Sequence, residues 1–454
     1  MLLSERREET ALLGDLMAIP KFGTGTGLDR MRKLCRELLD LPWMSALDAI
    51  KVTGSNGKGS ACAMIAAILG ELGVRCGLYT SPHLLSFQER IVVDGQPIAD
   101  GDLASAVHWV LARRDEYGAV HPGDQVGAFE VFTCLALHHF AQARPEALVL
   151  EAGIGGRHDS IRIVPGNLVG LTSLDLEHTE VLGPTLDAIA CDKADLCPPG
   201  GILVVGGIEP AVRRRLLSHC RRQDVRVIDA LEQVRPRALA FEGDRMIADL
   251  DLDGERWAGV EIGLVGRHQA ENAAVAILLV REWLARHRPG IAPGELERAV
   301  RRGLAGVRWP ARFQRIGRAP EVFADVGHTP GAMARLAETA GAVLRGRRIV
   351  LVTGVSYDKR VEQVVTPLLP LADHVICTRA YHKGSPAATI AEIVRRHRPQ
   401  LPLEIEPRIE GAVERAITLA RGHDMSVLIA GGLFLAIEAA QALRGKEPRD
   451  LRFF

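Results

Sequence analysis

The chain has 454 residues, and at roughly 150 residues per domain this length corresponds to two or three domains. A composition of 47% hydrophobic and 25% charged residues is typical of a soluble globular protein. The 56 basic and 56 acidic residues cancel to a formal net charge of zero, which argues against nucleic acid or a membrane surface as partner, since proteins with such partners carry an excess of Lys and Arg. A local anion site remains compatible with this balance, because it needs only a few donors.

The N-terminal segment, MLLSERREETALLGDL, is charged and helix-like, and it lacks the apolar core of a signal peptide. No stretch of the chain approaches the ~18 apolar residues of a membrane span. The eight cysteines are scattered, without a C-x-x-C pair, and most lie in apolar stretches. This pattern favours buried thiols in a reducing cytosol over disulfides or a zinc site, so we expect a cytoplasmic protein.

Short apolar runs alternate with longer amphipathic runs over the first 300 or so residues, which predicts a mostly parallel sheet covered by helices on both faces. The predicted strands lie at residues 49–53, 76–80, 147–151, 168–173 and 202–205. The predicted helices lie at residues 61–72, 102–114, 129–143 and 268–287.

The alternation breaks at residues 303–318, GLAGVRWPARFQRIGR, where no period is visible. It restarts with predicted strands at residues 322–325, 349–353, 374–378 and 427–430. Predicted helices lie at residues 331–344, 361–369, 387–396, 411–420 and 434–443. We therefore predict an α/β protein with a P-loop-containing, mostly parallel sheet domain over residues 1–306 and a smaller Rossmann-like α/β domain over residues 307–454.

The strongest local motif is KVTGSNGKGS, residues 51–60, in which a strand runs into glycines and a lysine before an Ala-rich helix. The loop amides and the helix N-terminus point at one spot, and Lys58 adds a positive charge, so the loop suits phosphates. The strict P-loop pattern is not met, because Val52 occupies the position of its first Gly and Gly59 separates Lys58 from Ser60. The alternative is a plain Gly-rich turn.

Two further motifs end strands of the same predicted sheet, where ligands usually bind. GLYTSPHL carries Ser81 and His83. These residues either bind a ligand, as hydrogen-bond donors or metal ligands, or belong to a structural turn. LVLEAGIGGRHD ends an apolar strand at Glu151, and in nucleotide hydrolases an acid at such a position holds magnesium.

The segment SLDLEHTEVLGPTLDAIACDKADL adds His178 among acids and Lys193 near a predicted helix end, where a lone lysine is normally solvated. Five arginines follow, and we interpret them as a solvated helix face. They are Arg213, Arg214, Arg215, Arg221 and Arg222.

In chain order these motifs resemble those of the folylpolyglutamate synthase / dihydrofolate synthase family of the Mur ligase superfamily, over nearly the whole chain. The strings GLDR, YTSPHLLSFQERI, FE, WPARFQ, DVGHTP and the adjacent Asp358 and Lys359 extend the resemblance. It implies an ATP-dependent acid–amino-acid ligase of folate biosynthesis and one-carbon metabolism. Such an enzyme phosphorylates a carboxylate with ATP and joins the acyl phosphate to an amine. Here it would join L-glutamate to dihydropteroate or to the glutamate tail of a folate.

The resemblance also implies roles for individual residues. Catalytic roles fall to Lys58, Lys193 and His178. The ATP phosphates would be held by Gly57, Lys58, Gly59 and Ser60. Further nucleotide contacts would come from Asn272, Arg312, Asp325 and His328, so that ATP would lie between the two domains and closure would complete the site. Two Mg²⁺ ions would be bound by Ser81, Glu151, His178 and Lys193, the last as a carbamate.

The acceptor side departs from the family pattern while the ATP and metal residues are nearly intact. The matching or neighbouring substrate residues are Arg30, Gly127, His158, Asp159 and Ser160. GGRLDATN has become GGRHDSIR, DGAHNP has become DVGHTP, EKAGI has become DKADL, and Gly127 stands in place of a Thr. Arg162, introduced by these changes, is either a ligand for an extra carboxylate or a solvated surface arginine.

Two alternatives therefore stay open beside the folate ligase. One is a Mur-type amide ligase acting on a different carboxylate, which the altered acceptor residues favour and which GLDR and Asp159 oppose. The other is a P-loop nucleotide-binding regulator without ligase activity, which the complete set of Ser81, Glu151, His178 and Lys193 opposes. The expected partners are small molecules only, and we expect a monomer.

Overall fold

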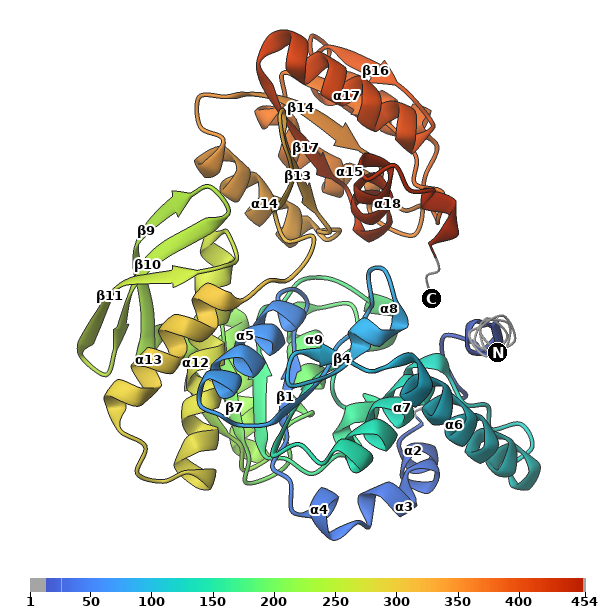
Figure 1. Ribbon diagram of the computed structural model, residues 1–454, viewed down its shortest axis with the longest axis vertical. Helices are drawn as coiled ribbons and strands as arrows, with labels where there is room; N and C mark the ends of the chain where they lie inside the picture. The colour runs from blue at the N-terminus through green and yellow to red at the C-terminus, as the bar shows by residue number, and fades with distance from the viewer. Residues whose placement is uncertain (1–13, 26, 452–454) are drawn as a thin grey trace. The chain divides into compact units, whose positions relative to one another are not determined.

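The structure is a computed structural model that describes residues 14–25 and 27–451 (Figure 1). The N-terminal helix that we predict lies largely outside the described residues. Contacts divide the chain into two compact units. The first comprises the chain up to Arg235 together with Glu271–Leu304, and the second comprises Pro236–Ala270 and the chain from Ala305 onward.

The first unit is built on an eight-stranded sheet in the order β4-β3-β2-β5-β1-β6-β7-β8. Its five central strands are parallel and confirm the five predicted ones: β2 (Cys76–Tyr79), β5 (Ala147–Glu151), β1 (Ile50–Thr53), β6 (Leu168–Leu171) and β7 (Ile202–Val205). The other three are β8 (Arg226–Asp229), which is parallel, and the antiparallel β3 (Ile91–Val93) and β4 (Gln96–Pro97). Our sequence analysis did not predict these three strands because they are short and either exposed, as β4 is, or only partly buried.

The predicted helices of this unit are also present, as α5 (Lys58–Glu71), α6 (Asp100–Val120), α7 (Ala128–Ala143) and α12 (Arg267–His287). Further helices are α2 (Leu28–Leu34), α3 (Arg36–Leu39), α4 (Pro42–Ser45), α8 (Thr179–Leu182), α9 (Leu186–Ala194), α10 (Pro210–Arg222), α11 (Ala230–Gln233) and α13 (Pro293–Gly306), with 3-10 turns η1 (Phe87–Arg90) and η2 (Ser160–Ile163). On α10 the five arginines are partly or fully exposed while Val212, Leu216 and Cys220 are buried, which confirms the solvated helix face.

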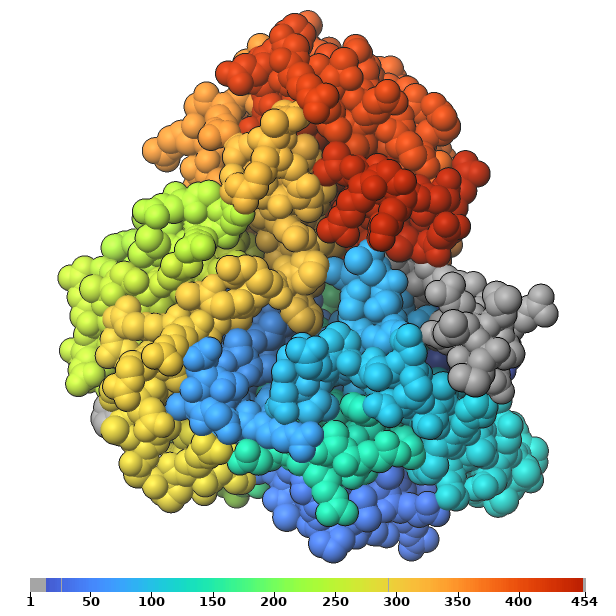
Figure 2. Space-filling model, in the orientation of Figure 1, coloured from blue at the N-terminus to red at the C-terminus, as the bar shows by residue number. Residues whose placement is uncertain are grey.

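The two faces of the sheet are covered by different helices. Lys51 of β1 pairs in register with Leu150 and Val169, which belong to the core shared with α2, α7 and α9. Residues opposite each other in neighbouring strands point to the same face, so Lys51 points toward that core. On the other face, Gly170 of β6 lies against α12, and Gly303 of α13 lies against α5; Figure 2 shows the surfaces of α13 (yellow) and α5 (blue) adjoining.

The second unit contains a six-stranded sheet in the order β12-β13-β17-β14-β15-β16. The four predicted strands are present and parallel, as β13 (Glu321–Asp325), β14 (Arg348–Thr353), β15 (His374–Cys377) and β17 (Met425–Ala430). The edges are the antiparallel β12 (Gln314–Arg318) and the short parallel β16 (Leu403–Ile405). Its helices are α14 (Pro330–Val343), α15 (Val361–Val365), α16 (Ala387–His397), α17 (Ile409–His423) and α18 (Leu433–Leu443), with η3 (Thr366–Leu371) and η4 (Pro448–Asp450).

A three-stranded sheet in the same unit has no counterpart among the predicted elements. It consists of β9 (Val234–Glu242), β10 (Arg245–Leu252) and β11 (Glu255–Ile262), with β10 and β11 antiparallel. Strand β10 buries every second residue, from Met246 to Leu252, and exposes or half-exposes the residues between them. Such a half-buried strand lacks the continuous apolar run by which the other strands were found.

The eight cysteines are unpaired, and seven of them are buried. In the part of the chain that the structure describes, no helix is both long and apolar enough to cross a membrane.

Candidate functional site

The loop between β1 and α5 has a shape that only glycine permits at two positions. Gly54 has φ 142° and Gly57 has φ 87°, values that residues with a Cβ rarely adopt. A Cβ on Gly54 would overlap Oγ1 of Thr172, and a Cβ on Gly57 would lie 2.5 Å from Oδ1 of Asn272. The glycines of the predicted phosphate loop are therefore required by both backbone conformation and space.

Residues that follow β6 hold this loop in place. Oγ1 of Thr172 donates to the carbonyl of Asn56 at 2.6 Å, and Oγ of Ser173 donates to the same carbonyl at 3.0 Å. The amide of Asn56 in turn donates to Oγ of Ser173 at 3.1 Å. The loop is thus organised by the protein itself, before any ligand binds.

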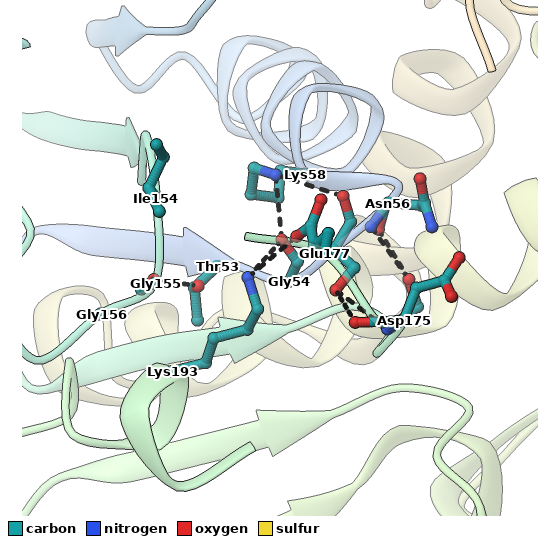
Figure 3. Close-up of polar contacts among 12 residues, drawn as sticks. Thr53, Gly54, Asn56, Lys58, Ile154, Gly155, Gly156, Asp175, Glu177 and Lys193 are labelled. Atoms are coloured by element: carbon teal, nitrogen blue, oxygen red, sulfur yellow. Dashed lines mark hydrogen bonds and ion pairs between the residues drawn. The ribbon is translucent and has the colours of Figure 1, made fainter. Parts of the chain in front are cut away.

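Two lysines from distant parts of the chain converge on one carbonyl of the loop (Figure 3). Nζ of Lys58 donates to the carbonyl oxygen of Gly54 at 2.9 Å, and Nζ of Lys193 donates to the same oxygen at 3.0 Å. Lys193 is almost completely buried, with 1% of its surface exposed, and also donates to Oε1 of Glu177 at 3.3 Å. Two ammonium groups this close repel each other, so the arrangement favours binding of an anion.

Burial and neighbouring charges set the ionisation of this cluster. The pKa of Lys193 is lowered to about 8, chiefly by burial and also by the charge of Lys58, while Glu177 acts in the opposite direction. Burial opposes the charge on Glu177, but the charges of Lys58, Lys193 and His178 outweigh it and hold the pKa of Glu177 below its ordinary value. Glu177 is therefore ionised at neutral pH, whereas Lys193 has an appreciable neutral fraction near pH 8.

Ser60, in the first turn of α5, has an unsatisfied hydroxyl. It is 1% exposed, and its Oγ has no hydrogen-bond partner among the residues described. Buried polar atoms almost always have a hydrogen-bond partner. We therefore expect a bound ligand to supply the partner of the Ser60 hydroxyl. A phosphate oxygen or a hard cation such as Mg²⁺ would satisfy an oxygen at this position.

Two of the predicted metal ligands lie together at the carboxyl ends of neighbouring strands. Oε2 of Glu151, the last residue of β5, accepts a hydrogen bond from the amide of Ser81 at 3.0 Å. His178 lies at the N-cap of α8, where it has φ 47°. Its charge is one of those that lower the pKa of Glu177. His83 is buried and accepts a hydrogen bond from Nε of Arg90 at 2.8 Å, as expected for the structural alternative.

Within residues 14–25 and 27–451, no group of three or more His, Cys, Asp or Glu side chains is placed to hold a metal ion. The predicted metal set contains only two residues of these types, Glu151 and His178. To complete a magnesium site, this set would need oxygen ligands from Ser81, from a modified Lys193 and from the bound substrate. Mg²⁺ commonly takes such oxygen ligands and keeps several waters.

The glycine-rich loop after Glu151 packs tightly on the helix that carries Lys193. The amide of Gly156 donates to Oδ1 of Asp192 at 3.0 Å, and a Cβ on Gly156 would lie 2.5 Å from the carbonyl oxygen of Lys193. Asp159 closes this loop by accepting hydrogen bonds from the amides of Gly153, Ile154 and Ile161. Burial raises the pKa of Asp159 to about 6, against the effect of these three bonds and of Lys193.

The predicted substrate residue Arg30 lies in a buried ion-pair network. Its Nη2 donates to Oε1 of Glu130 at 2.8 Å, its Nη1 donates to the carbonyl of Thr24 at 2.9 Å, and it pairs with Asp124. Burial alone would lower the pKa of Arg30, but the two carboxylates raise it. Arg30 therefore ties α2 to the start of α7, and most of its donors are occupied.

Close packing in the same network explains why residue 127 is a glycine. A Cβ there would overlap the backbone of Gly23, and the amide of Gly127 donates to Oε2 of Glu130 at 2.7 Å. A threonine would not fit this close approach. The remaining substrate candidates differ in exposure, because His158 is exposed while Ser160 is buried.

The predicted nucleotide residues of the second unit lie around the end of β13. Oδ2 of Asp325 accepts from the amide of Phe313 at 2.8 Å, and Oδ1 accepts from the amide of Gly327 at 2.7 Å. Desolvation raises the pKa of Asp325, against these two bonds and the charge of Arg312. Arg312 lies between two residues with positive φ, and Asp325 holds one of them, so this carboxylate positions the arginine. Nδ1 of His328 lies 3.1 Å from the carbonyl of Val326.

Sequence reasoning missed several residues of the first-unit site. Glu177, the ionic partner of Lys193, lies in EHTEVLG directly before His178 but was assigned no role. Thr172, Ser173 and Asp192 were missed because hydrogen bonds to a distant loop leave no mark in local sequence.

Comparison with known proteins adds the family. Residues 311–433 match the domain described as "Mur ligase, glutamate ligase domain". The chain is 32% identical to the folylpolyglutamate synthase of Lacticaseibacillus casei, covering 87% of this chain and 90% of that protein. It is 33% identical to a Halobacterium salinarum protein named as a probable bifunctional folylpolyglutamate synthase/dihydropteroate synthase, over 93% of this chain. The chain spans about half the length of the two haloarchaeal relatives that it matches.

A solved structure gives the same result. The folylpolyglutamate synthase of Mycobacterium tuberculosis, complexed with ADP and AMPPCP, matches with a TM-score of 0.87 and 26% identity, covering 98% of this chain and all of that chain. Fold and site together define a two-unit α/β protein with a P-loop-like first unit and a Mur ligase second unit. The chain belongs to the folylpolyglutamate synthase / dihydrofolate synthase family of the Mur ligase superfamily.

Proposed function

We propose that the chain is an ATP- and Mg²⁺-dependent amide ligase that joins L-glutamate to the carboxylate of a pterin or folate through an acyl phosphate. The observation that carries the proposal is the convergence of Lys58 and Lys193 on the Gly54 carbonyl, beside the unpartnered hydroxyl of Ser60. This combination supplies positive charge and an unsatisfied oxygen at the start of a helix, which suits the phosphates of ATP. The names of the relatives support the acceptor and the amino acid.

In this proposal the residues of the chain act mainly through charge and position. Phosphoryl transfer from ATP to a carboxylate needs its developing negative charge neutralised, and in this proposal Lys58 and the amides of residues 57–60 neutralise it. Magnesium, when bound, screens the repulsion between phosphate and carboxylate. Ser81, Glu151, His178 and Lys193 would hold it, and the hydroxyl of Ser60 offers a further oxygen. Arg312, Asp325 and His328 would contribute nucleotide contacts from the second unit.

Lys193 would act as a carbamate. Its neutral amine would attack CO₂, form an N–C bond and release one proton, leaving an anion on the lysine nitrogen's new carboxyl group. The pKa of about 8 supports this, because it provides the neutral amine that the reaction requires. The carbamate would exchange a buried cation beside Lys58 for an anion, which relieves the repulsion between the two lysines and adds oxygen ligands for magnesium.

The acceptor is the less supported part of the proposal. Asp159 has three backbone donors and Arg30 is largely occupied by its ion pairs, so both have few sites left for a substrate. The same chemistry on another carboxylate therefore remains the second candidate. We also propose a cytoplasmic monomer, in keeping with eight unpaired cysteines.

Release of ADP tests the proposal. The full chain is incubated with ATP, magnesium and glutamate, with dihydropteroate added, then tetrahydrofolate, then neither. Stimulation by either pterin, absent in Lys58→Ala, is the expected result, and stimulation by dihydropteroate identifies the dihydrofolate synthase reaction. A response to neither pterin, with intact ATP binding, would overturn the folate assignment. ATP binding without turnover on any carboxylate would indicate the regulator.

A further inference from the structure

A second cavity in the first unit lies away from the phosphate loop. It has a volume of about 890 Å³ and is lined by the segments that precede β1, β6 and β7, including Asp48, Gly166 and Pro198. In a parallel sheet these segments lie at the amino ends of the strands, opposite the carboxyl ends that carry the phosphate loop. Figure 1 shows α4 at this end of β1, at the lower edge of the view.

The side chain of Lys51 reaches this cavity from inside the sheet. Lys51 is 2% exposed, and its only hydrogen bond in the described structure is a long one, 3.4 Å from Nζ to the carbonyl oxygen of Gly166. An ammonium group has three donors, so two of them have no acceptor from the residues described. A buried cation with so little compensation is costly, which points to an acceptor that the chain does not provide.

The rest of the lining is strongly basic for a protein of zero net charge. Arg32, Arg162 and Arg286 join Lys51, and Asp48 is the one acidic residue among the described lining residues, which leaves three positive charges in excess with histidine neutral.

Asp48 acts on Lys51 only through its charge and forms no hydrogen bond or ion pair with it. Its Oδ2 pairs with Nη1 of Arg286 at 2.6 Å and lies 3.5 Å from Nε2 of His287, and its Oδ1 accepts from the amide of Asn167 at 2.7 Å. Arg162 has one hydrogen bond within the described residues, from Nη1 to the carbonyl of Arg157 at 2.8 Å, and so keeps donors for another partner. Lys51 and Arg162 therefore line the same cavity, and neither forms an ion pair with a carboxylate of the described residues.

We propose that this cavity binds a small polyanion, with phosphate or carboxylate groups held between Lys51 and Arg162. The site is separate from the phosphate loop and does not depend on the ligase activity. Its volume exceeds that of one phosphate, so the ligand carries two or more anionic groups or an anionic group on a larger molecule.

Calorimetric titration of the full chain tests this with two probes, tripolyphosphate and citrate, in magnesium-free buffer. We expect one or both to bind to the wild type. Lys51→Met and Arg162→Gln should each weaken that binding by about tenfold or more, since each removes a charge-assisted bond. Arg214→Gln, on the exposed face of α10, should leave it unchanged, whereas Lys58→Met should remove only the binding of phosphate at the phosphate loop.

The outcomes separate the possibilities. Tighter binding of tripolyphosphate identifies a phosphate ligand, and tighter binding of citrate identifies a carboxylate ligand. Binding that only Lys58→Met removes would assign the anion to the phosphate loop and overturn the proposal. Absence of binding by the folded wild type would overturn it as well. Arg162→Gln keeps the test decisive if Lys51→Met fails to fold, and tungstate located between the two side chains by anomalous scattering would place the ligand directly.

Discussion

Two buried lysines lie at opposite ends of strand β1 and share a pKa of about 8. Lys193 contacts the carbonyl of Gly54, just after the strand, whereas Lys51 contacts the carbonyl of Gly166, beside its beginning. Burial lowers both pKa values, but the surroundings differ. Lys193 has an ionised partner in Glu177 and a neighbour in Lys58, while Lys51 has one long bond to a carbonyl. Equal burial therefore goes with an ion pair at one end and with no ion pair at the other.

The largest expected effect is at the phosphate-loop end. Lys193→Ala should reduce ligase turnover by about a thousandfold or more, because in the proposed mechanism it removes a group that organises charge around the transferred phosphate. Small carboxylates such as acetate should partly restore activity if the lysine acts as a carbamate. The measurement is ADP release, with circular dichroism as the control for folding. Turnover equal to that of the wild type would remove Lys193 from the mechanism.

A third buried cation, Arg30, differs from both lysines because it forms ion pairs with two carboxylates, and we expect these pairs to stabilise the fold. Arg30→Met should lower the free energy of unfolding by about 3–5 kcal/mol, because it leaves Glu130 buried without its partner. Arg32→Met is the matched control, since Arg32 and Asp29 are both exposed and such pairs contribute at most about 1 kcal/mol. Urea unfolding measures both variants. A loss for Arg30→Met no larger than the control would mean that the network is not structural.

The ionisation of Lys51, near the amino end of β1, can be tested through the pH dependence of stability. Below pH 8 both folded and unfolded chains hold the proton of Lys51, and folding must bury a charge. Between about pH 8 and pH 10.5 only the unfolded chain holds it, so the free energy of unfolding rises with pH in this window. The displacement of the pKa from 10.5 to about 8 corresponds to about 3 kcal/mol.

Lys51→Met should therefore lose about 3 kcal/mol of this rise in stability with pH, relative to the wild type, in urea unfolding between pH 7 and pH 10.5. The exposed Lys446→Met serves as control for removal of one charge. An identical pH profile for wild type and Lys51→Met would show that the buried lysine has an ordinary pKa.

The smallest effect concerns the shape of the phosphate loop. Gly57→Ala should destabilise the protein by about 1–2 kcal/mol more than Gly73→Ala. Both glycines have positive φ, but a Cβ on Gly57 meets Asn272, whereas nothing lies within 4 Å of a Cβ on Gly73. Thermal unfolding of the two variants isolates the contact from the backbone strain. Equal losses would mean that Asn272 moves aside without cost.

Much of the fold followed from local pattern. Buried parallel strands such as β1 and β14 are apolar runs between amphipathic helices, so their positions could be predicted within a few residues. Strand β10 could not be found in this way, because it alternates polar and apolar residues and its partners lie in the same short sheet. The edge strands β4 and β8 were not predicted, because a strand with a single neighbour is exposed, as β4 is, or largely exposed, as β8 is, and so carries a weak apolar pattern.

The sequence by itself predicted the phosphate loop, since its glycines, Lys58 and the following helix are adjacent in the chain. Only the tertiary structure decided which buried lysines matter and how. Strand β1 lies between β5 and β6, so residues more than a hundred positions apart meet at each of its ends. The physical reason is that the pKa of a buried charged group depends on the groups around it, and the strand order decides which groups these are. Lys193 was identified by resemblance alone, and Lys51 was passed over as one residue of a strand. Their shared pKa and unequal partners arise from that strand order.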